Sequence, residues 1–399
     1  MGHREFIAFS ATLGITISFA IDAILPAFDD MKLSLDLAPE SNQLALSITA
    51  YLVTMSLGQM FYGPLADRFG RKPTLFIGLA ICVVGVALST FATSLAVLLA
   101  GRAIWGLGAA SIRVLANTLA RDLYEGDAMT RVLSLVMAVF LLGPVFAPLI
   151  GEALLSFTTW RVVFALCGTI TLIIAAWSIR LVETLPPEAR TAPMPNQTRD
   201  AVRAVLTNRQ TMGNTLSVMF VFAILATFLA SSQLVIDEIY ERADQYAVLF
   251  SVLSAGSVLA ALANTRAIDL LGSRRVVLMS SASFVVTGGF LSMISIAADG
   301  HPDFWLWFAA TTIMIGFVAI LLPTATSVAL NPLGHIAGTA SAVVGTVSAG
   351  FGSVLGAVVD SQISDSVTPM SVSALVFGLL AHASARWAQD ESAVGEPAA

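Results

Sequence analysis

Residues 63–75 read GPLADRFGRKPTL, a short charged stretch between two long apolar runs, 42–66 and 73–101. Each run is long enough to cross a membrane as a helix, which takes roughly 20 apolar residues. The chain must therefore turn sharply between two antiparallel helices, and Gly70 suits the tightest position of that turn. Asp67 lies at the C-terminal end of the first helix, where the helix dipole disfavours an anion, so it needs a nearby cation such as Arg71.

The same alternation of apolar runs and short polar turns continues along the chain. The 399 residues are 57% hydrophobic and 12% charged, whereas a soluble domain carries about 25% charged residues. In lipid the backbone must satisfy its own hydrogen bonds, so runs of this length are expected to be helices. The sequence therefore predicts an all-α membrane protein with twelve spans, at 6–28, 42–66, 74–93, 95–120, 130–154, 161–182, 211–236, 245–267, 276–298, 304–330, 337–360 and 367–385.

The positions of lysine and arginine predict the orientation. If the N-terminus is cytoplasmic, fifteen of the twenty basic residues lie on the inner side and three on the outer side, with Arg102 and Arg113 inside the fourth span. Cytoplasmic loops of membrane proteins are enriched in such residues. We therefore expect a multi-pass protein of the bacterial inner (cell) membrane with both termini in the cytoplasm.

The longest polar segment, 183–210, follows the sixth span and divides the chain into two halves. The sequence DRFGRK at 67–72 has a faint counterpart, DLLGSR, at 269–274. We predict two pseudo-symmetric bundles of six helices, 1–182 and 211–387, joined by a cytoplasmic linker, 183–210. Residues 388–399 are predicted to be a cytoplasmic tail.

GPLADRFGRKPTL closely resembles the signature between helices two and three of the major facilitator superfamily. Repeated six-helix halves are also the plan of that superfamily, which places the substrate site near the membrane midplane between the halves. The resemblance implies a cytoplasmic charge cluster that rearranges as the transporter changes state, formed by Gly63, Asp67, Gly70, Arg71 and Asp122. The alternatives are a generic basic loop and, for Asp122, an exposed loop residue.

A second motif lies in the fifth predicted span, FLLGPVFAPLIG at 140–151. Its prolines remove backbone donors and loosen the helix, and its glycines allow close helix contact. It resembles the signature of proton-coupled antiporters of the superfamily through Gly143, Pro144, Pro148 and Gly151, although Glu152 replaces a usual second glycine. A bend that serves packing alone is the alternative.

Three further segments narrow the resemblance. IDAILPA at 21–27, ETLPPEAR at 183–190 and GHIAGTASAVVGT at 334–346 resemble the Bcr/CflA branch of drug:proton antiporters. The resemblance covers nearly the whole chain, and it is more specific in the first half than in the second.

One carboxylate lies inside the first predicted span, in SFAIDAILPAF at 18–28. An ionised aspartate at the centre of a membrane helix costs about 2.5–3.5 kcal/mol, so it is retained only with a partner or a function. Pro26 cannot donate a hydrogen bond to the carbonyl of Asp22, so the helix opens beside the carboxylate. We expect water, a proton or a cationic substrate to bind there.

Arg102 is the expected partner of Asp22, because it lies well inside the apolar fourth span. Burial favours a protonated acid, whereas a nearby arginine favours the carboxylate. If Arg102 approaches Asp22 in one conformation and withdraws in another, the affinity for a proton changes with the state. The family resemblance assigns proton coupling and substrate exchange to these two residues, and a static buried ion pair is the alternative.

Five other residues are candidates for the substrate pocket. Tyr51 and Gln59 lie where the family resemblance places polar cavity residues, and Phe19 and Met55 share helix faces with Asp22 and Tyr51; bundle packing is the alternative for these four. Arg113 lies on the same helix face as Arg102, and it either lines the cytoplasmic half of the cavity or pairs near the inner surface. Two further acids at span ends, Glu152 and Asp360, are expected to be exposed to solvent rather than to take part in coupling.

The sequence favours transport over catalysis. Its four histidines lie at predicted span ends or in loops, and the Gly106-x-Gly108 pair lies inside a span rather than after a strand. We expect no enzyme activity, cofactor, metal or nucleic acid. The expected partners are protons, the bilayer and an amphipathic drug or metabolite, and the protein is expected to act as a monomer. The predicted function is proton-coupled efflux by alternating access with Asp22 as the exchange acid, and a metabolite importer or facilitator of the same superfamily is the alternative.

Overall fold

The computed structural model describes residues 1–38, 41–124, 142–190 and 195–389. Eleven of its helices are long and apolar enough to cross a membrane. A further apolar helix, Leu142–Leu155, follows directly after residues 125–141, so part of the predicted span 130–154 lies outside the described residues. The predicted all-helical, multi-pass fold is confirmed.

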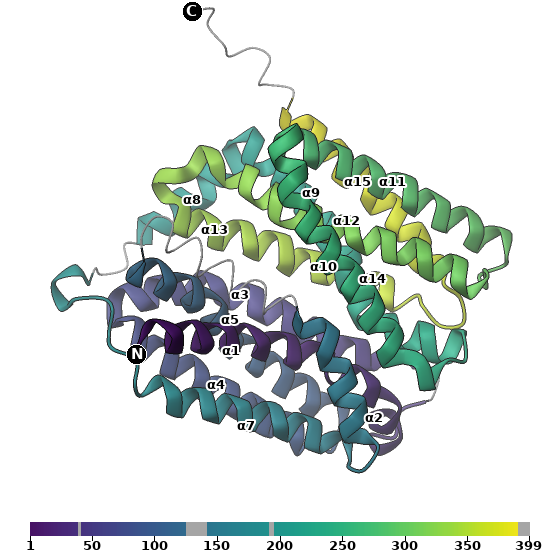
Figure 1. Ribbon diagram of the computed structural model, residues 1–399, viewed down its shortest axis with the longest axis horizontal. Helices are drawn as coiled ribbons and strands as arrows, with labels where there is room; N and C mark the ends of the chain where they lie inside the picture. The colour runs from purple at the N-terminus through teal and green to yellow at the C-terminus, as the bar shows by residue number, and fades with distance from the viewer. Residues whose placement is uncertain (39–40, 125–141, 191–194, 390–399) are drawn as a thin grey trace, which may run out of the picture. The chain divides into compact units, whose positions relative to one another are not determined.

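One compact unit comprises Met1–Met194 together with Arg242–Val252. Its helix α5 is in contact with α1, α3 and α4, and α7 lies against α1 and α4 (Figure 1). The helices of this unit are α1 (His3–Asp22), α2 (Phe28–Ser34), α3 (Ala45–Phe69), α4 (Arg71–Thr90), α5 (Leu95–Leu123), the helix Leu142–Leu155 and α7 (Trp160–Ser178).

Glycines let the backbones of α3 and α4 approach α5 closely. A Cβ added to Gly85 of α4 would lie 2.3 Å from the backbone nitrogen of Trp105, and one added to Gly106 of α5 would lie 2.2 Å from the carbonyl oxygen of Tyr51. Both contacts are far shorter than any real Cβ contact, so only glycine fits. This packing brings Tyr51 and Trp105 together inside the unit.

The first span is interrupted at its acid. The α-helix ends at Asp22, a 3-10 turn over Leu25–Ala27 contains Pro26, and α2 then continues to Ser34. Sequence alone predicts a single run ending at residue 28, whereas the apolar segment extends over Glu5–Ser34. Because proline lacks an N–H, the chain changes its hydrogen-bonding pattern where the carboxylate lies.

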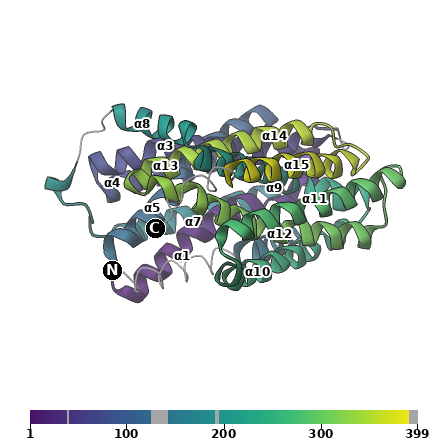
Figure 2. The same ribbon diagram turned by 90° about the horizontal axis from the view of Figure 1, so that it is seen from above.

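The second compact unit comprises Pro195–Glu241 and Leu253–Ala399. Helix α9 lies against α12, α14 and α15, and Figure 2 shows α8 beside α13. The helices are α8 (Pro195–Thr207), α9 (Arg209–Leu234), α10 (Tyr246–Leu271, of which the residues up to Val252 belong to the first unit), α11 (Ser273–Ala297), α12 (Phe304–Leu330), α13 (Ala337–Gly345), α14 (Gly352–Asp360) and α15 (Thr368–Gln389). Part of the predicted linker 183–210 is therefore helical, as α8.

The predicted span 337–360 contains a π-helical turn, Thr346–Phe351, between α13 and α14. Its small residues pack closely: a Cβ on Gly352 would lie 2.8 Å from the carbonyl oxygen of Met219, and one on Gly356 2.9 Å from that of Ala223. These contacts place α14 directly against α9.

The expectation that Asp360 is exposed is wrong. The last residue of α14 is only 3% exposed, and its carboxylate accepts a hydrogen bond of 2.7 Å from the Ser231 hydroxyl of α9. Its place at a predicted span end suggested solvent, but the close packing of α14 on α9 turns the side chain inward. Glu152, in contrast, is partly exposed.

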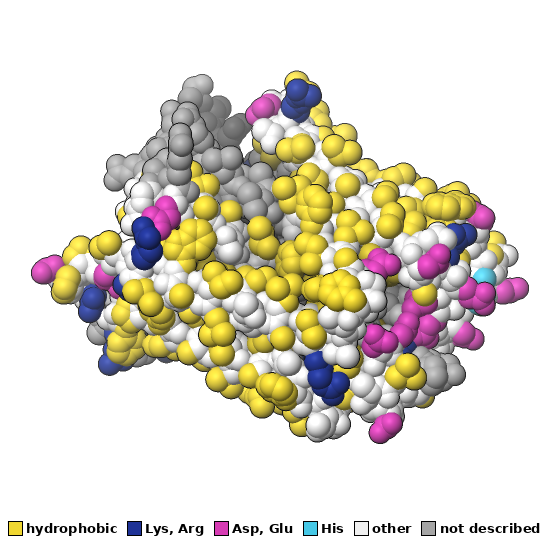
Figure 3. Space-filling model, turned by 60° about the horizontal axis from the view of Figure 1, so that its bottom comes forward, with side chains coloured by type: hydrophobic (Ala, Val, Ile, Leu, Met, Phe, Trp, Pro, Cys, Tyr) yellow, Lys and Arg dark blue, Asp and Glu magenta, His cyan; other side chains and the backbone are white. Residues whose placement is uncertain are grey.

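Apolar side chains cover much of the molecular surface. Figure 3 shows them spread across the face that it draws, among uncharged polar side chains and backbone, with the charged side chains in scattered groups. Leu259, Val286 and Met293 are 69%, 70% and 60% exposed. An apolar exterior of this kind fits a protein whose helices face lipid.

Candidate functional site

Asp22 is the last residue of α1 and lies inside the first unit. Only 3% of its surface is exposed. Among the described residues no ion pair joins Asp22 to Arg102, although both belong to the same unit. The structure therefore shows a conformation in which the acid and the arginine are not paired.

Arg102 is fully buried in α5 and is held by carbonyl groups of two other helices. Its Nε donates to the carbonyl oxygen of Ser47 in α3 at 3.1 Å, and its Nη1 donates to that of Ala20 in α1 at 2.7 Å. Ala20 comes two residues before Asp22. The guanidinium thus bonds to the last turn of α1 through its backbone rather than through the carboxylate.

Two aromatic rings enclose the same guanidinium. The Arg102 Cζ lies 4.6 Å from the ring centroid of Tyr51 and 5.0 Å from that of Trp105. The two rings meet edge to face with centroids 5.7 Å apart. A cation over an aromatic face is attracted by the negative face of the ring, most strongly when water is excluded.

The other predicted pocket residues have different surroundings. Phe19 and Met55 are buried, at 9% and 3% exposure, and Gln59 is half-buried. Arg113 is exposed and makes no hydrogen bond or ion pair within the described part of the chain. It lies eleven residues after Arg102, which is three helical turns along the same face.

The helix Leu142–Leu155 packs on α1 through the glycines of the predicted antiporter motif. A Cβ on Gly143 would lie 2.5 Å from the Cβ of Ser18, and one on Gly151 only 2.1 Å from the carbonyl oxygen of Ala23. Ala147, midway between them, is fully buried. The three small residues form a ridge against the last turn of α1, on both sides of Asp22 along the sequence. Pro144 and Pro148 lie within the same helix.

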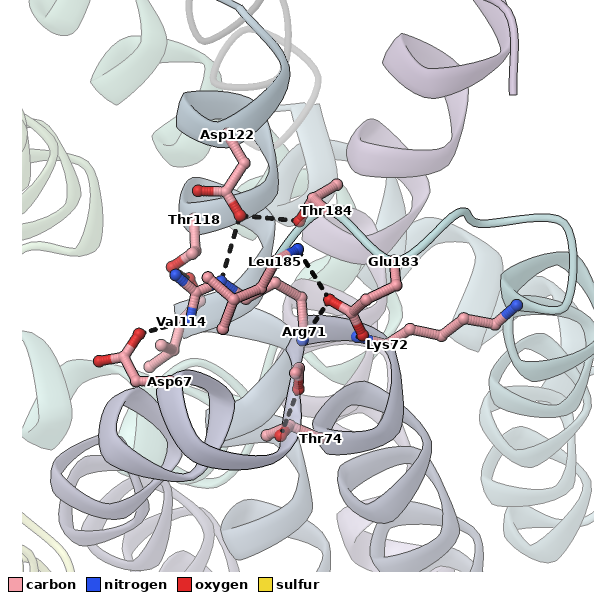
Figure 4. Close-up of polar contacts among 11 residues, drawn as sticks. Asp67, Arg71, Lys72, Thr74, Val114, Thr118, Asp122, Glu183, Thr184 and Leu185 are labelled. Carbon is pink, nitrogen blue, oxygen red and sulfur yellow. Dashed lines mark hydrogen bonds and ion pairs between the residues drawn. The ribbon is translucent and has the colours of Figure 1, made fainter. Parts of the chain in front are cut away.

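A second group of polar residues surrounds Arg71, at the start of α4 (Figure 4). Its guanidinium binds Asp67 through Nη1 and the Asp122 Oδ2 through Nε at 3.1 Å. The same Asp122 oxygen accepts a hydrogen bond of 2.7 Å from the Thr184 hydroxyl. The structure thus brings together Asp67, Arg71 and Asp122, three of the residues of the predicted cluster.

The two motif glycines of this region differ. Gly70 is the single residue between α3 and α4, and its φ of 103° belongs to a backbone conformation that side chains disfavour. A Cβ on Gly63 would meet nothing within 4 Å. The tight turn therefore requires Gly70, and the packing gives no reason for Gly63.

Glu183 belongs to the same cluster and was missed by the sequence analysis. Its carboxylate accepts hydrogen bonds from the backbone N–H of Arg71 at 2.8 Å, of Lys72 at 3.1 Å and of Leu185 at 3.0 Å. The first N–H groups of a helix have no partner within it, and its N-terminus attracts negative charge. Gly70 offers no capping side chain, which was the signal in the sequence that the first N–H groups of α4 find acceptors elsewhere, although it did not point to Glu183 itself.

Trp105 was also missed, although it is three residues after Arg102 and so on the same helix face. A bulky aromatic residue in an apolar span fits packing equally well, so the sequence alone did not single it out. Its contact with the arginine lies within α5, and Gly85 of α4 packs against its backbone.

A multi-pass helical protein with a buried acid, a buried arginine and a charge cluster at a helix turn has the features of a secondary transporter. The family model of the Major Facilitator Superfamily matches residues 7–357. This chain belongs to that superfamily, whose members are transporters of small molecules rather than enzymes.

Curated relatives agree with the Bcr/CflA resemblance. The chain is 28% identical to a bicyclomycin resistance protein homolog of Haemophilus influenzae over 373 residues, which covers 92% of each protein. It is 27% identical to the multidrug resistance protein MdtL of Salmonella typhi over 336 residues, covering 82% of this chain and 83% of that protein.

Solved structures show the same fold at low sequence identity. A D-xylose-proton symporter superposes with a TM-score of 0.76 at 14% identity and 97% coverage of both chains. The human organic anion transporter MFSD10 gives a TM-score of 0.72 at 14% identity, covering 98% of this chain and all of the other.

Proposed function

We propose that this protein exports drug-like small molecules in exchange for protons, and that proton and substrate compete at Asp22. The observation that carries the proposal is a buried carboxylate at the broken end of a membrane helix, with an arginine bonded to the same helix turn rather than paired with it. The names of the bicyclomycin and multidrug resistance relatives support the substrate class.

The chemistry of the site favours exchange. A buried acid takes up a proton readily when no cation stabilises its ionised form, and it releases that proton when a cationic substrate or an arginine approaches. Asp22, at the end of α1, is such an acid. Arg102 is bonded to the carbonyl of Ala20, which comes two residues before Asp22 in the chain. Movement of α1 relative to α5 then links protonation to the state of the transporter.

A proton gradient supplies enough free energy for efflux. A membrane potential is worth about 2.3 kcal/mol per charge per 100 mV, and one pH unit about 1.4 kcal/mol. Each 1.4 kcal/mol corresponds to about a tenfold concentration ratio. At 100 mV and one pH unit the two add to about 3.7 kcal/mol, so one proton per cycle sustains a gradient of a neutral substrate of about two to three orders of magnitude.

The test is transport of a cationic dye and of chloramphenicol into everted membrane vesicles, driven by an imposed pH gradient. We expect wild type to accumulate at least one of them and Asp22→Asn, at matched expression, to lose at least about 90% of the gradient-driven flux. Asp30→Asn is the matched control, because Asp30 is an exposed acid on α2. Undiminished proton-driven flux in Asp22→Asn would contradict the proposal, and flux in the same direction as the protons would favour an importer.

A further inference from the structure

Arg102 has one donor group to spare. Its Nε and Nη1 are bonded to the carbonyls of Ser47 and Ala20, whereas Nη2 is buried and has no hydrogen-bond partner in the described part of the chain. A buried guanidinium with an unmatched N–H is costly, because the lost contact with water is not replaced. The two carbonyl hydrogen bonds do not compensate for the buried Nη2, so a further attraction is needed to favour this position.

The rings of Tyr51 and Trp105 supply that attraction. They lie 4.6 Å and 5.0 Å from the Arg102 Cζ, and all three side chains are at most 1% exposed. Both rings are fixed by their helices: Gly106 lies under the carbonyl of Tyr51, and Gly85 lies against the backbone of Trp105. The guanidinium thus fits a preformed aromatic site and leaves its Nη2 group without a hydrogen-bond partner among the described residues.

We propose that Tyr51 and Trp105 are positioning residues, whose rings hold Arg102 in this site apart from Asp22 and so set the pH at which transport is half-maximal. The proposal rests on the exchange function proposed for Asp22. Two positions compete for the guanidinium, one between the rings and one beside the carboxylate. Occupancy of the first leaves Asp22 free to take up a proton, whereas occupancy of the second stabilises the carboxylate and expels the proton.

The end of α1 connects the two positions. The Arg102 Nη1 already bonds to the carbonyl of Ala20, two residues before Asp22, so the guanidinium is anchored at the helix turn that ends in the acid. Nη2, which has no partner among the described residues, is the group that would donate a hydrogen bond to the carboxylate. Pairing with Asp22 would draw the guanidinium away from the rings of Tyr51 and Trp105 and so weaken its contacts with them.

Few other titratable groups face this site. Tyr51 of α3 lies against Arg102, and the buried thiols Cys82 of α4 and Cys167 of α7 belong to the same unit. On the helix Leu142–Leu155, which packs on α1, the titratable group is Glu152, which is partly exposed. Among the described acids on the helices around Arg102, Asp22 is therefore the one that is buried about as deeply as Arg102 itself.

The test compares the pH dependence of transport in Tyr51→Leu and Trp105→Leu with that of wild type. Loss of either ring frees Arg102 for the carboxylate, so protonation requires more acid and the pH of half-maximal transport falls, by about half to one unit. Tyr51→Phe keeps the ring and is expected to restore the wild-type midpoint. Phe9→Leu is the matched control, because Phe9 is an equally buried ring of α1 that meets Trp177 edge to face instead.

A second measurement does not depend on transport. Infrared titration of the purified protein, as the difference between wild type and Asp22→Asn, reports the pH at which the protonated carboxyl band of Asp22 appears. Increasingly fluorinated tryptophans at position 105 keep the shape of the ring and weaken its attraction for a cation, so the band should move stepwise to lower pH. These variants preserve packing, which keeps the test decisive even if a leucine variant does not fold.

An unchanged midpoint in the leucine and fluorinated variants, with Asp22→Asn inactive, would overturn the positioning role and leave the exchange function intact. Normal proton-driven transport by Asp22→Asn would instead overturn the exchange function itself. The two failures are therefore distinguishable.

Discussion

The backbone at Gly70 has φ 103° and ψ 161°, a combination that is almost restricted to glycine. A Cβ there would also lie 2.5 Å from the Glu183 Oε2. We expect Gly70→Ala to lower the free energy of unfolding by about 1–3 kcal/mol through backbone strain, with further loss from displacement of the carboxylate. Thermal unfolding in detergent, followed by circular dichroism, measures the change.

Gly63→Ala is the matched control from the same motif. It lies within α3 and a Cβ would meet nothing within 4 Å, so alanine should leave stability unchanged or raise it by up to about 1 kcal/mol, as expected for a helix interior. Equal losses in the two variants would contradict the assignment of the turn to Gly70 alone.

Single residues show where the sequence was informative and where it was not. Asp22 and Arg102 stood out because a charge in an apolar run needs a reason. Trp105 and Glu183 did not, because an aromatic residue in a span and an acid in a loop are ordinary. Their importance depends on which side chain lies opposite, and that is set by tertiary packing.

At the scale of an element, α4 depends on Glu183 for its N-terminal cap. Glu183→Ala removes the acceptor of two of its first backbone N–H groups and the favourable interaction of a carboxylate with the helix dipole. We expect the free energy of unfolding to fall by about 1–2 kcal/mol. Glu188→Ala, an exposed acid of the same segment, should change it by less than about 0.5 kcal/mol. A similar loss in both variants would argue against the cap.

The contact between α1 and the helix Leu142–Leu155 is a second element-scale feature. Gly151→Ala would place a Cβ 2.1 Å from the carbonyl oxygen of Ala23, next to Asp22, so the two helices must separate. Overpacking of this kind costs about 1–3 kcal/mol, and we expect efflux in vesicles to fall with stability. Gly289→Ala, where the nearest atom is an ordinary 3.7 Å away, should transport as wild type does.

The helices themselves were largely predictable. The predicted span 304–330 coincides with α12, and the run 95–120 differs from α5 by three residues at its end. Apolar length determines such spans. The break beside Asp22 was predicted from Pro26, because a proline marks it in the sequence itself. The π-helical turn Thr346–Phe351 and the inward Asp360 were not predicted, because they depend on neighbouring helices and not on hydropathy.

At the scale of the whole molecule, the distribution of basic residues predicts that both termini are cytoplasmic. Native Cys82 and Cys167 are buried, so introduced cysteines can be labelled selectively. In intact cells a membrane-impermeant thiol reagent should label Ser361→Cys, an exposed residue after α14, and should not label Glu188→Cys, an exposed residue of the predicted linker. Labelling in the opposite pattern would invert the topology.

The most direct test of exchange at Asp22 is proton release from the purified protein when substrate binds. A weakly buffered solution at a pH near the midpoint of transport, with a pH indicator, reports the protons released on addition of a substrate found in the vesicle assay. We predict that wild type releases protons in proportion to bound substrate and that Asp22→Asn releases none. Equal release by both proteins would show that the proton comes from another group and would contradict the assignment of exchange to Asp22.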